Sequence, residues 1–549
     1  MPLRPPFLSR PSAIIVPLLV VLPLLIAFYS LTLGQDGNWD LRNYHWYNAY
    51  AFLTGRELVL DVAPAQVATY YNPTLDLPIY WLAQVLPARG VSFVLSFVQG
   101  LNLVPLTGLG WVLLAGLNPR SRALAAVALA LACFLGGGQM GLLGTTFYDN
   151  VISLFVLGSA WLVVARAGDV WDGPGRRAFP VVFVAGLMVG GAVGLKQPTL
   201  PYAIGLCFAF LAVAGGFWRR MFLAFFFGIG VIAGMALFSG HWMWHLWSTY
   251  QNPLFPYFND VFRSPWGVPE PYRDDKFLPH GVWNNLVFPY SWVTDPRKVG
   301  EILFTDLRVP VMYVVLLATP LLLAAGRLMG RRPAAGVPVR PALYVIVAGA
   351  LTYLAWLKLF SIYRYLIPLE MLAPLVMVAA IGLWPLPARA RGALVLALLV
   401  LVSVTARPGT WARMPFADRF VEVNVPALPD PDNTIVIQTG YAPTSFLAYG
   451  FPPQVPFLRV HSYFIHPDHG DILLNRRMRQ RIDAHDGDFF WLVAHWEVWT
   501  ADHILPAYGL VADMGDCRLV TSNLDEPMML CRLRRSSAPQ PEPAPEAVP

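Results

Sequence analysis

The feature that most constrains this chain is a series of long apolar runs without charged residues. A helix that crosses a bilayer needs about 17 to 25 mostly apolar residues. Eleven runs match or approach that length: residues 11–35, 90–119, 123–148, 151–165, 178–195, 197–218, 221–259, 309–326, 341–357, 371–388 and 392–406. The composition, 56% hydrophobic and 13% charged, excludes an ordinary soluble globular protein. We therefore predict a polytopic α-helical membrane protein with about 11 transmembrane helices.

The arginines predict how these helices are oriented, because Lys and Arg are retained in cytoplasmic loops. If the N-terminus is cytoplasmic, the cytoplasmic segments are rich in Arg and contain only Asp169 and Asp172 as acids. We read the first apolar run as a retained helix of a cytoplasmic (inner) membrane protein, since it is too long for a cleaved signal peptide. An odd number of spans then places the chain after residue 406 outside the cytoplasm. The net charge of +6 follows from this bias and indicates no nucleic-acid partner.

Two acids follow the first apolar run, Asp36 and Asp40, in the sequence GQDGNWDLRNYHWYNAYAFLTGRE. A carboxylate beside lipid is costly unless it has a partner or a task, so both are functional candidates. From Asp40 onward the spacing predicts a helix on which Tyr44 and Tyr47 share a face with the acid. The alternative is that both acids only cap and solubilise an interfacial helix.

An Asp after the first helix, followed by a helix that carries Tyr and Ala and ends at Gly55, resembles the first external loop of the GT-C glycosyltransferases. The mannosyltransferase and aminoarabinose transferase-like enzymes belong to this superfamily, in which the acid is the catalytic base and the donor is a polyprenyl-linked sugar. The resemblance implies that Asp40 is the base, with Asp36 second, and that Tyr44 and His45 contact substrate.

Further short motifs resemble GT-C sequences at the external ends of the predicted spans. Tyr71, Asn72 and Pro73 resemble the aromatic-Pro motif before the second helix. Asp149, in TTFYDN, occupies the place of a second acid, although a helix N-cap at Asp149 or Asn150 is the alternative.

Two cations also stand at external ends of spans. Lys196, in LKQPT, is similar to a Lys-Pro-Thr string, and its alternative is a lysine that extends to the interface. Arg364, in SIYRYLIPLE, resembles the phosphate-contacting Arg of the superfamily, and its alternative is an ion pair with Glu370. The resemblance implies that Lys196 and Arg364 bind the donor phosphate and that Tyr365 contacts substrate.

The longest external loop, 239–308, contains the string NPLFPYFND. Two prolines force an irregular path there, and aromatic rings and amides suit a sugar, so Tyr257, Asn259 and Asp260 are candidate substrate contacts. The other large external loop spans 35–89, and both belong to a GT-C-like transmembrane module at 1–406. Neither metal-ligand spacing nor a cofactor motif is strong in the chain, and a divalent-metal requirement stays open.

The chain becomes polar after the Pro-rich stretch 408–415, which predicts a small extracytoplasmic α/β domain at 407–535. Residues 433–438 and 489–494 read as strands, with a helical segment at 471–485 between them. Cys517 and Cys531 lie in sequences that would pair as two strands, where a disulfide would persist outside the cytoplasm. The tail 536–549 is predicted to be disordered.

The function expected from the resemblance is that of an inverting hexosyl- or pentosyltransferase of GT-C type in cell-envelope glycan biosynthesis. It would move a sugar from a polyprenyl-(di)phosphate donor to a lipid, glycan or protein acceptor, in contact with membrane lipids. Alternatives are a transporter or flippase of lipid-linked glycans and a surface-polysaccharide polymerase or ligase. The charges lie at span ends and no internal repeat is evident, which favours the enzyme.

Overall fold

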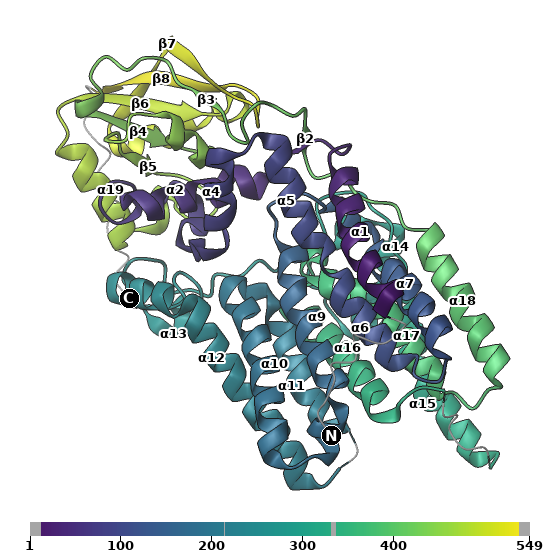
Figure 1. Cartoon of the computed structure of the whole chain (residues 1–549). Coiled ribbons are helices and arrows are strands. Elements are labelled where there is room, and N and C mark those ends of the chain that lie inside the picture. The colour runs from purple at the N-terminus through teal and green to yellow at the C-terminus, as the bar shows by residue number, and fades with distance from the viewer. Residues whose placement is uncertain (1–11, 214, 331–335, 537–549) are drawn as a thin grey trace. The chain divides into compact units, whose positions relative to one another are not determined.

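The computed structural model describes residues 12–213, 215–330 and 336–536, so most of the tail predicted at 536–549 lies outside the described residues. The chain divides into two compact units (Figure 1). The helical unit comprises Met1–Leu33, Ser92–His241 and Asp274–Trp411, and the sheet unit comprises Gly34–Val91, Trp242–Arg273 and Ala412–Pro549. The segment predicted as the external loop 35–89 and the first part of the loop 239–308 thus belong to the same unit as the C-terminal domain.

The helical unit is built from the apolar runs of the sequence. Its helices are α1 (Ser12–Ser30), α6 (Leu103–Leu113), α7 (Pro119–Phe134), α8 (Gly137–Gly141), α9 (Asp149–Ala165), α10 (Gly175–Leu195), α11 (Leu200–Ala212), α14 (Val282–Thr294), α15 (Arg308–Leu328), α16 (Val339–Leu359), α17 (Ile367–Leu383) and α18 (Ala388–Val404). Two further helices, α5 (Ala88–Gly100) and α12 (Phe217–Tyr250), begin in one unit and end in the other.

Six helical segments are long and apolar enough to cross a membrane: Ala88–Leu113, Gly175–Leu195, Phe217–Tyr250, Arg308–Leu328, Val339–Leu359 and Tyr363–Leu383. Three shorter apolar helices are Ile15–Ser30, Asp149–Ala165 and Gln197–Ala212. Each of the eleven runs contains a helix, but several of these helices are shorter than their run. The predicted count of about 11 spans is therefore not confirmed, although a membrane protein is indicated.

Helix α17 forms the centre of the helical unit. Of its most apolar stretch, 94% is buried within the protein, against 22% for α12. A helix that is apolar on all sides is expected to be enclosed by others, and α17 contacts α6, α7, α9, α15, α16 and α18. Residues at the start of α17 are thereby held in fixed positions.

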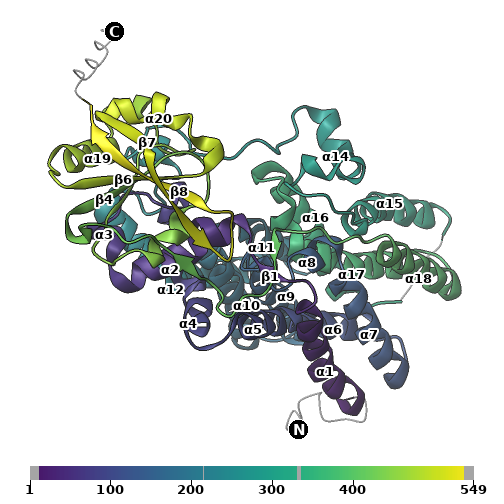
Figure 2. The ribbon, with the colours of Figure 1, turned by 90° about the horizontal axis from the view of Figure 1, so that it is seen from above.

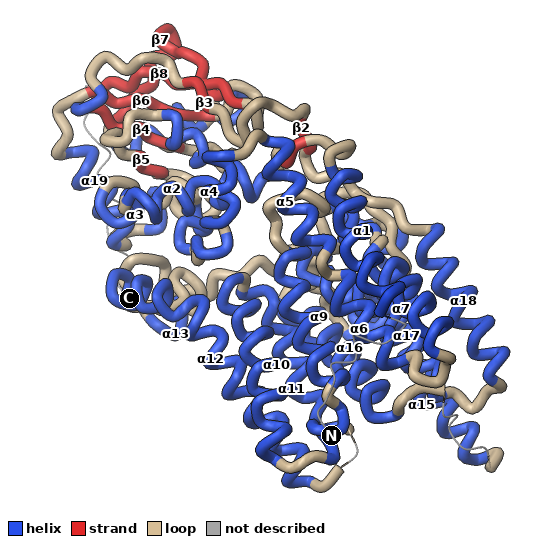
Figure 3. The backbone as a smooth tube through the Cα atoms, viewed as in Figure 1, coloured by secondary structure: helices blue, strands red, loops and turns tan. Residues whose placement is uncertain are grey.

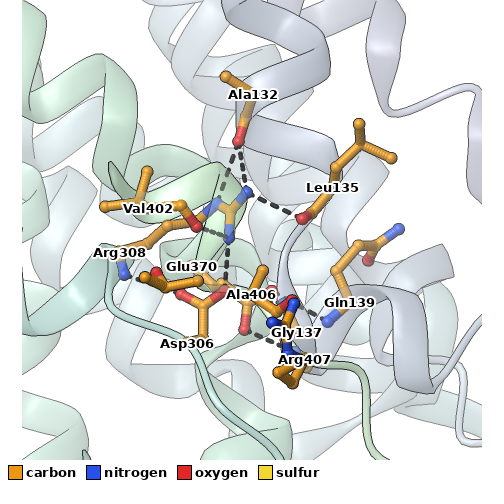
Figure 4. A network of polar contacts seen from close by, with 12 residues as sticks. Ala132, Leu135, Gly137, Gln139, Asp306, Arg308, Glu370, Val402, Ala406 and Arg407 are labelled. Atoms are coloured by element: carbon orange, nitrogen blue, oxygen red, sulfur yellow. Dashed lines mark hydrogen bonds and ion pairs between the residues drawn. The ribbon is translucent and has the colours of Figure 1, made fainter. Parts of the chain in front are cut away.

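A buried ionic network lies next to the start of α15 (Figure 4). Arg308 is fully buried and forms an ion pair with Asp306, while its Nη2 donates to the carbonyls of Ala132 and Leu135 at 2.9 and 2.8 Å. Asp306 Oδ2 also accepts the backbone N–H of Gly137 at 2.8 Å. Each charge in this network therefore has direct hydrogen-bond partners, which a buried ion requires.

The carboxylate of Glu370 occupies the glycine-rich turn that begins α8. It accepts the backbone N–H groups of Gly138 and Gln139 at 3.1 and 2.9 Å. A Cβ at Gly136 would lie 1.8 Å from Glu370 Oε1, so no larger residue fits there. Backbone N–H groups thus bind the Glu370 carboxylate. This counts against the alternative that Glu370 serves mainly as the ion-pair partner of Arg364.

All described strands belong to the sheet unit, as the red segments of Figure 3 show. A two-stranded ladder pairs β1 (Gln35–Asp36) with β2 (Arg413–Met414). A six-stranded sheet has the order β3-β7-β8-β6-β4-β5. Its strands are β3 (Val423–Asn424), β4 (Thr434–Gln438), β5 (Phe457–Arg459), β6 (Asp488–Val493), β7 (Leu510–Ser522) and β8 (Met528–Arg535).

The sheet is mixed, with β4 parallel to both β5 and β6 and the other neighbours antiparallel. The strands predicted at 433–438 and 489–494 are confirmed as β4 and β6, and the helix predicted at 471–485 as α19 (Leu473–Asp483). One apolar core joins Leu474 and Met478 of α19 to Ile437 of β4 and Trp491 of β6. Figure 2 shows α19 beside β6, and α20 (Thr500–His503) contacts β7.

The remaining helices of the sheet unit are α2 (Trp46–Thr54), α3 (Arg56–Val59), α4 (Leu77–Val85) and α13 (Asn259–Phe262). The stretch around α3 is fixed to the edge of the sheet by Asp61. Its buried carboxylate forms an ion pair with Arg56 and accepts the N–H of Phe457 at 2.8 Å, beside a bridge between Val62 and Leu458. Burial raises the pKa of the Asp61 carboxyl, an effect that the Arg56 charge opposes.

The predicted disulfide is confirmed between Cys517 of β7 and Cys531 of β8, which face each other across the ladder. The bridge closes a loop of 14 residues. Replacing both cysteines by Ser is expected to lower the free energy of unfolding of the sheet unit by about 3 kcal/mol, because the unfolded chain regains the entropy of that loop. Unfolding of the purified protein in guanidinium, followed with and without a reductant, measures this loss.

A reductant should destabilise the unaltered protein but leave the doubly substituted protein unchanged. Equal destabilisation of both proteins would show that the disulfide does not carry the effect. The other two cysteines, Cys133 and Cys207, are unpaired, as expected for cysteines within apolar runs.

Candidate functional site

Asp36 holds the turn that begins the helix after the first apolar run. It is fully buried, and both of its carboxylate oxygens accept the side-chain amide of Asn38, at 2.7 and 2.8 Å. Asn38 Oδ1 in turn accepts the N–H of Leu41 at 2.8 Å. Asp36 also lies opposite Arg413 in the ladder, and burial lowers the pKa of that guanidinium, an effect that the Asp36 charge opposes. These contacts make Asp36 a structural anchor.

Asp40 lies at the start of a π-helical turn, Leu41–His45, that leads into α2. Turns of this kind are often found at functional sites because they displace side chains from regular helical positions. Tyr44 Oη donates to Asp40 Oδ2 at 3.2 Å, and Asp40 is 9% exposed. Tyr47, predicted to share the face of Asp40, donates its hydroxyl to Asp61 at 2.8 Å, since the π-helical turn shifts the helical period.

Two further polar groups complete what we call the acid–aromatic cluster, formed by Asp40, Tyr44, His45, Tyr71 and Asp76. His45 Nδ1 and Asp76 Oδ1 are 2.6 Å apart, and both residues are buried. The ring of Tyr44 lies 4.0 Å from that of His45 and 5.1 Å from that of Tyr71. A carboxylate that orients an imidazole is an arrangement suited to proton transfer.

The candidate substrate contacts from the second loop take different positions in the sheet unit. Tyr257 extends the cluster, because its hydroxyl lies 2.6 Å from that of Tyr71. Asn259 is 1% exposed, and its side chain bonds the backbone of Ser264, Gly267 and Val268, so it holds a loop closed. Asp260 is exposed at the start of α13.

The helical unit contains a second group, the cation cluster, formed by Phe147, Asp149, Lys196, Arg364, Tyr365 and Trp411. Lys196 Nζ forms an ion pair with Asp149 Oδ1 at 2.9 Å and donates to the carbonyl of Phe147 at 2.6 Å. The ion pair departs from the predicted N-cap alternative, because Asp149 is the first residue of α9 and its carboxylate meets a lysine.

Arg364 lies among three aromatic rings in this cluster. Its Cζ is 4.2 Å from the ring centre of Phe147, 5.3 Å from that of Trp411 and 5.8 Å from that of Tyr365. Lys196 Nζ is also 5.8 Å from the Tyr365 ring. Cations held against aromatic faces keep their charge away from bulk water, which strengthens the attraction for an anion.

The loop that carries Phe147 and Asp149 is fixed by two amides of the second apolar run, which sequence reasoning missed. Gln99 Oε1 accepts the N–H of Gly144 at 2.7 Å, and Asn102 Nδ2 donates to the carbonyl of Asn150 at 2.6 Å. Buried amides inside an apolar run were the available signal, because such groups need partners.

Tyr148 has a strained backbone conformation, and Asp149 has unused hydrogen-bonding capacity. Tyr148 has a φ of +62°, a conformation that non-glycine residues rarely adopt and that is enriched at functional sites. Asp149 is 5% exposed, and its Oδ2 has no hydrogen-bond partner among the described residues. A hydroxyl or water at this oxygen would satisfy it.

The pocket beside Arg364 and Trp411 is nearly closed in this structure. The pocket lined by Gly138, Tyr363, Arg364 and Trp411, among others, has a volume of about 10 Å³. Small-molecule sites usually have roughly 300 to 1,000 Å³. A ligand the size of a sugar phosphate therefore needs side chains here to move.

Among the described residues, no group of three or more His, Cys, Asp or Glu side chains could hold a metal ion. No protein-family model, no characterised protein and no solved structure matches the chain. The function therefore has to be inferred from the two clusters and the membrane helices.

Proposed function

We propose that the protein is a membrane glycosyltransferase that uses a polyprenyl-(di)phosphate sugar as donor. It would act at the extracytoplasmic face and transfer the sugar, with inversion, to a lipid, glycan or protein acceptor. The observation that carries this proposal is the cation cluster, in which Lys196 and Arg364 are held next to aromatic rings by helix ends of an apolar unit. Paired cations in such surroundings suit a lipid-linked phosphate.

The proposed roles in this cluster follow from the chemistry of the leaving group. As the bond between sugar C1 and the phosphate oxygen breaks, negative charge grows on the phosphate, and Arg364 and Lys196 stabilise it. Arg364 presents a planar fork of N–H donors that matches two phosphate oxygens. Asp149 positions Lys196, with which it forms an ion pair.

In the sheet unit, Asp40 is the proposed general base. The acceptor hydroxyl oxygen attacks C1, its proton passes to the Asp40 carboxylate, and the polyprenyl phosphate leaves. Tyr44 supports this role, because its hydroxyl donates to Asp40 Oδ2 and so directs the carboxylate. His45 and Tyr257 are proposed to contact the sugar or the acceptor.

The proposal is tested by incubating the purified protein in detergent with a panel of polyprenyl-phosphate sugars that differ in the sugar, together with a membrane lipid and glycan extract that supplies acceptor hydroxyls. Consumption of one donor, with release of polyprenyl phosphate, is the expected result. If no donor is consumed while the protein moves lipid-linked glycans across vesicle membranes, the protein is a flippase and the proposal is wrong.

Replacing Arg364 by Lys is expected to weaken binding of the polyprenyl-phosphate sugar about tenfold, because the charge remains but the two-pronged contact is lost. Arg364→Ala should weaken it further. Donor affinity is measured by isothermal titration calorimetry with the purified variants in detergent.

The matched control is Arg122→Lys. The guanidinium of Arg122 also lies on an aromatic ring, 4.0 Å from that of Trp111, in the same unit. Its replacement should leave donor affinity unchanged. Equal donor affinity in Arg364→Ala and the unaltered protein would remove Arg364 from the phosphate site.

A further inference from the structure

A groove in the sheet unit is separate from the residues assigned to transfer. It is bordered by the end of α4 and the segment after it, Ala83–Pro87, by Asp418, Arg419 and Val421, and by the rings of Trp46 and Tyr449. Its volume is about 410 Å³, which lies within the range of small-molecule sites. The groove is therefore large enough for one or two sugar rings.

The groove combines aromatic rings with planar polar side chains. The rings of Trp46 and Tyr449 are 5.4 Å apart, and Tyr80 lies 4.8 Å from Trp46, so the aromatic wall is fixed by packing. Gln84, Asp418 and Arg419 are exposed and supply an amide, a carboxylate and a guanidinium. Tyr449 is half-buried, and an aromatic ring beside hydrogen-bond donors and acceptors suits a ligand with apolar faces and many hydroxyls.

The backbone of Asp418 and Arg419 is held in place, while their charged groups can contact a ligand. The carbonyl of Asp418 accepts the N–H of Ala88 at 3.2 Å, and the N–H of Arg419 is bound by Glu422 at 2.8 Å. The side chains of Asp418 and Arg419 are exposed at the groove. The groove is thus organised before a ligand arrives.

Trp46 borders the groove but is itself buried. Its side chain is 3% exposed, and its indole N–H has no acceptor within the residues that the structure describes. A buried donor without an acceptor costs about 1 to 3 kcal/mol. This N–H is enclosed by the protein, so the groups open to a ligand in the groove are those of the exposed Gln84, Asp418 and Arg419.

We propose that this groove binds a saccharide unit, a hexose or pentose that is free or part of a glycan. Sugar hydroxyls bond planar side chains such as Asp, Arg and Gln, and the C–H faces of the ring pack on aromatic rings. A phosphate fits less well, because the charge of Asp418 opposes that of Arg419. The saccharide site goes beyond the proposed function, since it needs no transfer step.

The test measures saccharide binding to the purified full-length protein in detergent by saturation-transfer difference NMR. The probes are glucose, galactose, mannose, arabinose and N-acetylglucosamine, with maltose and lactose as disaccharides, and inorganic phosphate as a competitor. At least one saccharide is expected to bind, unaffected by phosphate. Asp418→Asn and Arg419→Ala should each raise its dissociation constant about tenfold, the loss of one charge-assisted hydrogen bond.

The matched control is Asp486→Asn, which alters an exposed acid of the same unit and should leave binding unchanged. The inference is overturned if no saccharide binds, if binding is the same in all groove variants, or if phosphate competes for the site. Sugar binding without turnover of any donor would instead count against the proposed function alone.

Discussion

Replacing Asp40 by Asn is expected to slow glycosyl transfer by roughly 10²- to 10⁴-fold, the contribution typical of a positioned general base. A sugar hydroxyl is too weakly acidic to attack C1 unassisted. Asn has nearly the same shape as Asp, and its oxygen can still accept the hydroxyl of Tyr44, which now lies 3.2 Å from the carboxylate. Only the basic oxygen is lost. Turnover of the donor identified in the panel measures the rate, and calorimetry shows whether donor binding is intact.

Asp36→Asn is the informative comparison, because this acid has a different environment. Its two oxygens both accept the amide of Asn38. An amide at position 36 would direct N–H groups at other N–H groups, so stability should fall. The thermal midpoint should therefore drop in Asp36→Asn and stay close to normal in Asp40→Asn. If Asp36→Asn is folded but inactive while Asp40→Asn is active, Asp36 is the general base and Asp40 is not. If both variants are active, the proposed mechanism is wrong.

Features that depend on neighbouring residues could be predicted from the sequence. The strands at 434–438 and 488–493 and the helix α19 follow from local patterns of apolar and polar residues. The pairing of Cys517 with Cys531 followed from two short β-like sequences that only a tight connection separates. Such local patterns are informative because hydrophobic periodicity determines which face of an element is buried.

Contacts between distant segments could not be predicted in this way. The partner of His45 is Asp76, and the loop of Asp149 is fixed by Gln99 and Asn102. None of these partners is marked by a motif, since one hydrogen bond across many residues leaves no periodic pattern. The π-helical turn after Asp40 could not be predicted either, because a sequence pattern is matched to a regular helical period.

The number of spans stays unconfirmed for a related reason. An uncharged run predicts one continuous helix, but within the run 123–148 helix α7 ends at Phe134 and the short helix α8 begins at Gly137. The polar groups and glycines at such a break are bonded inside the protein. The sequence therefore stays uncharged across the break, and the apolar run does not reveal it. Apolar composition therefore reports burial, whether in lipid or in protein, and does not by itself report crossing.

The second large effect is expected at Asp306, in the ionic network of Figure 4. Asp306→Ala leaves the fully buried guanidinium of Arg308 without its ion-pair partner and also removes the acceptor for the N–H of Gly137. Removing one partner of a buried pair typically costs about 3 to 5 kcal/mol, because the remaining charge is uncompensated. We expect a marked fall in the thermal midpoint of the purified protein in detergent, followed by circular dichroism.

The chain supplies a matched control in Asp295 and Arg297. This pair has the same spacing, and Asp295 Oδ1 accepts the backbone N–H of Arg297 as Asp306 Oδ1 accepts that of Arg308. The Arg297 side chain is 71% exposed, whereas that of Arg308 is fully buried. Because water stabilises exposed charges without a partner, Asp295→Ala should change the thermal midpoint little. Equal shifts in the two variants would mean that burial of the Arg308 charge does not govern stability here. The hydrogen bond within the turn, which both pairs share, would then be the cause.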